Sequence, residues 1–81
     1  MKARVFVSLK KTVLDPQGQT IRSALNGRGY TAISDVRQGK VFEIEIADGT
    51  DPAAAKAQLD EIARDILTNP VIEEYEVVLD S

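Results

Sequence analysis

Two Asp-Pro pairs constrain the fold of this chain more than any other feature of its sequence, because each predicts where a helix begins. Asp15 and Asp51 can each accept a hydrogen bond from a free backbone N–H of the first helical turn. Proline suits the first helical position because it lacks the N–H that would have no partner there. We therefore predict one helix from Pro16 and a second from Pro52.

The two predicted helices differ in quality. The second has a clear helical period, with apolar residues on one face at Ala55, Leu59, Ile62, Ala63, Ile66 and Leu67. The first has only a short apolar stripe, Ile21, Ala24 and Leu25. Gly18 and Gly27 weaken it further, because each costs about 1 kcal/mol relative to alanine. A glycine in the first turn often marks the close approach of another backbone or a ligand, and we expect this at Gly18.

Four segments are predicted strands: residues 2–9, 32–37, 40–47 and 71–79. The first, third and fourth of them alternate in the way that half-buried strands do. Gln38-Gly39 separates the second from the third, and its glycine can supply the positive φ of a tight hairpin turn. With the two helices, the order is β-α-β-β-α-β. It predicts an α+β, ferredoxin-like fold, with an antiparallel four-stranded sheet and both helices on one face. We expect a single domain over residues 1–81.

The small size of the chain predicts that it associates with other chains. A domain of 81 residues buries only roughly 60–65% of the surface that its unfolded form exposes. The chain has no Cys and no His, so disulfides and the commonest metal ligands cannot stabilise it, and oligomerisation is left. Phe6 lies on the otherwise polar face of the first strand. It is either a partly exposed ring or a residue that packs against a partner, and a bare sheet face suits a two-fold dimer.

The composition argues against catalysis and against several kinds of binding. Without His or Cys the usual base–nucleophile pairs are absent, and carboxylates such as Glu43, Glu45 and Glu76 alternate with apolar residues, as on a solvated strand face. We therefore predict no catalytic residue, no metal and no cofactor in this chain. A formal net charge of −3 disfavours nucleic acid, and no apolar run approaches the ~20 residues of a membrane span. The first residues enter a strand pattern rather than a signal peptide, so we expect a cytoplasmic protein.

Polar and glycine-containing detail is concentrated in three connecting segments. They are residues 14–18 at the start of the first helix, residues 35–40 at the predicted hairpin, and residues 69–75, where Asn69-Pro70 ends the second helix. Each contains more polar residues and glycines than a helix cap or a turn requires. Together with Phe6, these segments supply the candidate contact residues: Leu14, Asp15, Pro16, Gln17, Gly18, Asp35, Arg37, Gly39, Lys40, Asn69, Pro70, Val71, Ile72 and Tyr75.

In order and spacing, the three segments resemble the PurS family. They read Leu14-Asp15-Pro16-Gln17-Gly18, Asp35-Val36-Arg37-Gln38-Gly39-Lys40 and Asn69-Pro70-Val71-Ile72-Glu73-Glu74-Tyr75, and the resemblance extends over essentially the whole chain. Members of that family are small subunits of phosphoribosylformylglycinamidine synthase, the glutamine-dependent ligase of purine biosynthesis. The resemblance implies a non-catalytic subunit that forms a dimer or tetramer. It also implies two partners, the synthetase subunit PurL, which would bind ATP and Mg²⁺, and the glutaminase subunit PurQ.

The role implied by this resemblance is to hold the synthetase and the glutaminase together and to support the transfer of ammonia between their active sites. No catalytic residue is carried over, and the three segments are carried over only as contact or shape-determining positions. At the predicted hairpin tip, Arg37 and Lys40 are either solvated charges or partners for acidic groups of another subunit.

Two other classes of protein share the predicted order of helices and strands. A regulatory module of the ACT type would bind a small molecule at a dimer interface, and binding of amino acids to the isolated chain would distinguish it. An acylphosphatase-like hydrolase would need a phosphate-cradling loop beside an arginine and an asparagine. Arg37 and Asn69 are present, but no such loop accompanies them.

Overall fold

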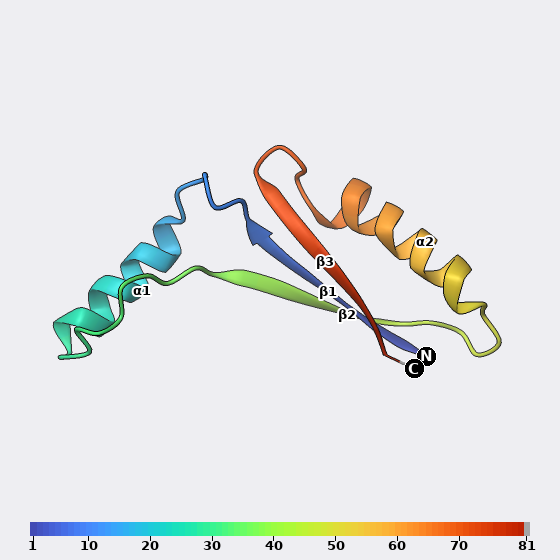
Figure 1. Ribbon diagram of the computed structural model, residues 1–81, viewed down its shortest axis with the longest axis horizontal. Coiled ribbons are helices and arrows are strands. Elements are labelled where there is room, and N and C mark those ends of the chain that lie inside the picture. Colours follow the sequence, from blue (N-terminus) through green and yellow to red (C-terminus); the bar gives the residue numbers. More distant parts are fainter. Residues whose placement is uncertain (81) are drawn as a thin grey trace.

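The described part of the chain folds into three strands and two helices (Figure 1). The computed structural model describes residues 1–80, with the elements β1 (Lys2–Leu9), α1 (Pro16–Gly27), β2 (Gly39–Glu45), α2 (Pro52–Ile62), η1 (Ala63–Leu67) and β3 (Glu73–Asp80). The element η1 is a π-helical turn that continues α2. The fold is α+β, but the long axis measures 51 Å against 26 and 14 Å for the others, because α1 stands away from the sheet. Within this described part, no helix is long and apolar enough to cross a membrane.

The sheet is antiparallel and has the strand order β2-β1-β3. In its register Val5 of β1 lies opposite Phe42 of β2 and Val77 of β3. Alternate residues of β1, namely Ala3, Val5 and Val7, are at most 1% exposed. The alternation predicted for the first strand is therefore confirmed, and the core lies on this face of the sheet, against α2 and η1.

Helix α2 covers that face and begins where the second Asp-Pro pair predicts. The Asp51 carboxylate accepts a hydrogen bond of 3.2 Å from the N–H of Ala54. The buried residues of its apolar stripe, continued into η1, are Ala55, Leu59 and Ala63. Ile66, predicted on the same stripe, is instead 74% exposed. The π-helical turn is the reason, because it takes more residues per turn than an α-helix and so rotates Ile66 away from the sheet.

Helix α1 does not cover the sheet. It begins as predicted, with Asp15 as its cap and Pro16 as its first residue, but it extends away beyond the end of β1 (Figure 1). The chain then runs back beside the helix to reach β2, and we call residues 16–37 the arm. The prediction that both helices lie on one face of the sheet is therefore wrong for the single chain.

The predicted second strand, residues 32–37, is absent from the sheet, which has three strands rather than four. In its place, side chains of α1 bind the backbone of this segment. Arg22 donates a hydrogen bond of 3.2 Å to the carbonyl of Ser34, and Asn26 donates one of 3.2 Å to that of Ile33. These bonds hold the segment beside α1 and away from the sheet of its own chain.

Gln38-Gly39 joins the arm to β2 and makes no hairpin turn. Positive φ occurs at Gly29 (97°) and Gly49 (84°), and not at Gly39. A Cβ at Gly39 would lie 2.7 Å from the carbonyl oxygen of Val7, so this glycine provides space rather than an unusual φ. The predicted tight turn is therefore wrong, although the position does favour glycine.

Candidate functional site

The three connecting segments meet where the arm joins the sheet. A cleft of about 230 Å³ lies there, which we call the junction cleft. It is lined by Val7, Ser8, Leu9, Asp15, Gln17, Gln38, Gly39, Lys40 and Glu73. Each of the three segments contributes to this set although they are far apart in the sequence, so the fold brings them together.

Asp15 holds this junction together. The residue is only 3% exposed, and its carboxylate oxygens accept one N–H each, that of Gly18 at 3.0 Å and that of Gln38 at 2.6 Å. The first bond caps α1, and the second fastens the chain entering β2 to the helix. The bond from Gln38 above all, then that from Gly18, and finally the positive charge of Arg37 hold the pKa of Asp15 below its ordinary value, against the opposite effect of burial. Asp15 is therefore a buried carboxylate that joins the start of α1 to the chain entering β2.

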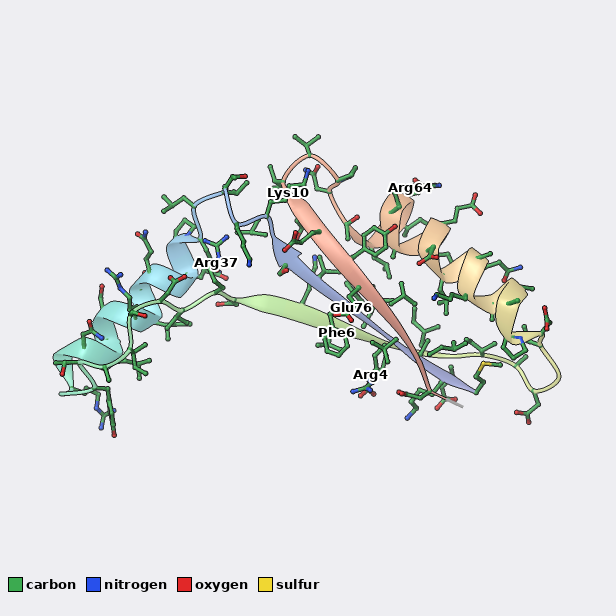
Figure 2. All side chains as sticks on the ribbon, in the orientation of Figure 1. Arg4, Phe6, Lys10, Arg37, Arg64 and Glu76 are labelled. Atoms are coloured by element: carbon green, nitrogen blue, oxygen red, sulfur yellow. The ribbon has the colours of Figure 1, made fainter. Side chains whose placement is uncertain are left out.

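Two further contacts fix the angle of the arm. Gly18 is buried, and a Cβ there would overlap the carbonyl oxygen of Val36, so the returning backbone passes directly over the first turn of α1. The close backbone approach predicted at Gly18 is confirmed. The Arg37 guanidinium donates hydrogen bonds of 2.9 Å to the carbonyl oxygens of Lys10 and Val13, in the connection between β1 and α1 (Figure 2).

Arg37 therefore folds back onto its own chain, and the expectation that it projects freely from a hairpin tip is wrong. Lys40 differs from it. The Lys40 ammonium lies 4.0 Å from the Glu73 carboxylate and 5.5 Å from the centroid of the Phe42 ring, and 54% of its side chain is exposed. Lys40 remains a candidate for contacts outside the chain.

The segment before β3 is a turn that presents apolar side chains outward. Asn69 accepts a hydrogen bond of 3.1 Å at its side-chain oxygen from the N–H of Val71, and its own N–H donates one of 2.8 Å to the Glu73 carboxylate. The carbonyl of Ile72 accepts a hydrogen bond of 2.8 Å from the N–H of Lys10, which ties the turn to the end of β1. Polar residues thus shape this turn, while Val71 is 77% exposed.

The other candidate residues do not gather in the cleft. Leu14 and Pro16 are exposed at the base of the arm, and the Asp35 carboxylate accepts a hydrogen bond of 2.9 Å from the N–H of the next residue, Val36. Tyr75 lies on the side of the sheet that α2 covers. Phe6 lies on the opposite side, half-buried, with the Arg4 guanidinium 5.6 Å from the centroid of its ring (Figure 2). Phe6 therefore does not line the junction cleft.

The geometry offers little to a metal ion. Among residues 1–80, no three Asp, Glu, His or Cys side chains are grouped so that they could hold one.

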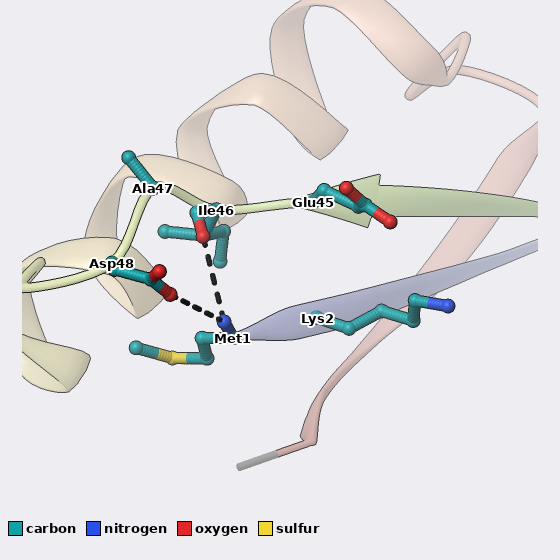
Figure 3. A pocket seen from close by; sticks show the side chains of 6 residues that line it. All are labelled: Met1, Lys2, Glu45, Ile46, Ala47 and Asp48. Carbon is teal, nitrogen blue, oxygen red and sulfur yellow. Dashed lines mark hydrogen bonds and ion pairs between the residues drawn. The ribbon is translucent and has the colours of Figure 1, made fainter.

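A larger hollow of about 470 Å³ lies at the other end of β1 (Figure 3). There the N-terminal ammonium of Met1 lies 3.5 Å from the carbonyl oxygen of Ile46 and 4.0 Å from the Asp48 carboxylate. The sequence analysis missed this hollow, because it depends on the register between β1 and β2.

These features define a small α+β module in which a helical arm is fixed to a three-stranded sheet by a buried carboxylate. The chain belongs to the PurS family, since the family model described as "PurS: Phosphoribosylformylglycinamidine (FGAM) synthase" matches residues 2–81. The resemblance drawn from the three segments is thereby confirmed.

Individual relatives agree with this assignment. The PurS subunit of phosphoribosylformylglycinamidine synthase from Mycobacterium leprae is 48% identical over 80 residues, which are 99% of this chain and 96% of the relative. The PurS subunit from Methanocaldococcus jannaschii is 40% identical over 76 residues, which are 94% of this chain and 90% of the relative. These matches favour PurS over the ACT-type alternative.

Solved structures are similar to this chain over nearly its whole length. The crystal structure of PurS from Methanocaldococcus jannaschii has a TM-score of 0.84 at 36% identity and covers 95% of this chain and 92% of its own. A chain in the structure of PurLQS from Thermotoga maritima has a TM-score of 0.85 at 30% identity and covers 95% of this chain and 93% of its own.

Proposed function

We propose that this chain is the small, non-catalytic subunit of a phosphoribosylformylglycinamidine synthase and acts in purine biosynthesis. The match of the PurS family model to residues 2–81 carries this proposal. The partners are a synthetase subunit of the PurL type, where ATP and Mg²⁺ bind, and a glutaminase subunit of the PurQ type. The relative whose structure is described as PurLQS supports this set of partners. The complex acts in the cytoplasm.

The shape of the chain suits a subunit that bridges others. Its long axis is 51 Å, and the contacts of Asp15, Gly18 and Arg37 keep the arm and the sheet in one relative orientation. Ammonia made by a glutaminase is lost by protonation and diffusion unless water is kept from its route. A subunit that holds two active sites together and excludes water therefore supports the reaction without reacting groups of its own.

We also propose that the chain self-associates through its arm. Three apolar side chains of the arm, Ile21, Tyr30 and Ile33, are 40%, 59% and 37% exposed. On the sheet, a hollow of about 290 Å³ lies between β2 and α2, and Ile44 and Leu59 are among its lining residues. The outer edge of β2 lies beside it, because β1 pairs with the other edge.

The arm of a second copy is suited to cover both the hollow and this edge. Its helix would lie beside α2, and its residues 32–37 would pair with the free edge of β2. The result is an antiparallel four-stranded sheet with two helices on one face, the arrangement that the sequence pattern predicts. Such an exchange of identical elements between copies is a common route to a two-fold dimer.

Reconstitution tests the proposed function. The chain is mixed with purified PurL-type and PurQ-type subunits from the same cell, and product formation is followed with glutamine or with free ammonia as the nitrogen donor. We expect glutamine-dependent turnover to require the chain and ammonia-dependent turnover to require it less. Equal dependence would remove ammonia transfer from the proposal, and failure to bind either subunit would overturn the proposal as a whole.

A further inference from the structure

One face of the sheet, opposite α2, is covered by no other element of the described chain, and we call it the bare face. Along the middle of this face run the residues of β1 that point away from α2, among them Arg4 and Phe6 (Figure 2). In the register, Phe6 lies opposite Val41 of β2 and Glu76 of β3. This face is distinct from the arm, and it adjoins the junction cleft at one end, where Ser8 and Gly39 belong to both.

The bare face carries the whole net charge of the chain. The register places five carboxylates on it, Glu43, Glu45, Glu74, Glu76 and Asp80, and two cations, Lys2 and Arg4. Its net charge is therefore −3, equal to that of the full sequence with its 13 acidic and 10 basic residues, so the remainder of the chain has eight of each sign. The charge asymmetry makes this face the negative pole of the molecule.

The charges surround an apolar centre. Phe6 is half-buried, Val41 is 52% exposed, and Val78 lies beside Phe6 on the same face. A hollow of about 300 Å³ adjoins the ring and is lined also by Glu74 and Glu76. An apolar centre with a charged rim is the usual anatomy of a protein–protein interface, where the aromatic residue contributes affinity and the rim contributes selectivity.

A second copy of the chain does not suit this face. A two-fold contact would bring a net charge of −3 against an identical one, and like charges across an interface oppose association. Arg4, the cation nearest the centre, already pairs with Asp80 through hydrogen bonds of 3.0 and 3.3 Å within its own chain. Nucleic acid, being negatively charged, is excluded by the same reasoning.

We propose that the bare face binds a basic protein surface, rich in Arg and Lys around an apolar residue, on a partner subunit of the synthase. The inference rests on the proposed function and adds to it the surface that meets a partner. The apolar group of the partner packs on Phe6, and its cations meet the carboxylates of β2 and β3. The arm remains the surface between copies.

Binding of the full-length chain to each purified partner subunit tests this inference. The test variant is Glu43→Gln/Glu76→Gln, which removes two charges from the bare face. The matched control is Asp48→Asn/Glu61→Gln, which removes two charges elsewhere. We expect the test variant to bind one subunit about tenfold more weakly at low salt and to lose most of the salt dependence of its association rate, while the control stays within about twofold of wild type.

Phe6→Ala supplies the second arm of the test. It should weaken binding to the same subunit at least about tenfold and leave self-association unchanged, as measured by sedimentation. If both variants bind as wild type does, the inference is overturned while the proposed function stands. If Phe6→Ala instead dissociates the chain from its own copies, the occupant is a second copy and the inference is equally overturned. If the wild-type chain binds neither subunit, the proposed function itself fails.

Discussion

The same substitution at two glycines of α1 should change stability in opposite directions. A Cβ at Gly18 would overlap the carbonyl oxygen of Val36 and would lie 2.9 Å from the Asp15 carboxylate. At Gly27, the last residue of the same helix, a Cβ would meet nothing within 4 Å. Gly18 is buried in the first turn and Gly27 is exposed at the end of the helix, so the added methyl group has space only at Gly27.

The size of each effect follows from these contacts. Overpacking costs about 1–3 kcal/mol, and the upper part of this range, about 2–3 kcal/mol, applies here because Val36 presents a backbone atom that cannot rotate away. Alanine returns at most about 1 kcal/mol of helix propensity at this position, so Gly18→Ala should lower the free energy of unfolding by about 1–2 kcal/mol. Gly27→Ala should raise it by about 0.5–1 kcal/mol, because alanine restricts the unfolded chain.

Urea unfolding followed by far-UV circular dichroism measures both variants. All samples need the same protein concentration, since self-association makes apparent stability depend on it. If Gly18→Ala proves as stable as Gly27→Ala, the arm does not pass over the first turn of α1, and the account of the junction is refuted.

Three further predictions concern the junction and the arm. Because the folded-state pKa of Asp15 is lowered, its contribution to stability is present above the ordinary value of 3.8 and is lost as the pH falls below it; Asp15→Asn should flatten this acid limb in unfolding measured against pH. Arg37→Ala should lower the free energy of unfolding by about 1 kcal/mol through loss of two charge-assisted hydrogen bonds, whereas Lys40→Ala should change it by less than about 0.5 kcal/mol in the same urea titration. Ile21→Glu should shift sedimentation equilibrium toward the monomer at micromolar concentration, since it would bury a charge in the proposed contact between copies, and an unchanged association would rule out the arm as that contact.

The sequence was sufficient for the features that depend on neighbouring residues. Both helix starts follow from an Asp-Pro pair, because the cap and the first helical residue are adjacent in the chain. The buried row of β1 follows from simple alternation. Ile66 illustrates the limit, because one π-helical turn shifts the phase of the helix and no residue pattern marked it beforehand.

The junction was only partly predictable. The sequence identified the three segments as candidate contact residues and Gly18 as a place where another backbone comes close. Their roles were not predictable, because Asp15 binds Gln38 and Arg37 binds Lys10 only once the chain has folded back on itself. A charged residue in a connecting segment has the same local sequence whether it binds its own backbone or another chain, and for Arg37 the sequence analysis considered only solvent or another subunit.

The position of the arm could not be predicted from the sequence for a deeper reason. A helix with a weak apolar stripe gains from burying Ile21 whether the apolar surface belongs to its own chain or to an identical one. Periodicity therefore predicts an apolar contact but does not say whether it forms within the chain or between two copies. The connection between the arm and the sheet decides between these two cases. Here Asp15, Val36 and Arg37 fix that connection in an extended geometry, so the arm cannot fold back onto its own sheet without breaking the hydrogen bonds that Gln38 donates to Asp15 and Arg37 donates to Val13. If the chain self-associates through its arm, as we propose, the junction residues control that contact through the angle that they impose on the arm. We therefore expect variants at the junction to alter self-association even where their side chains touch no second copy.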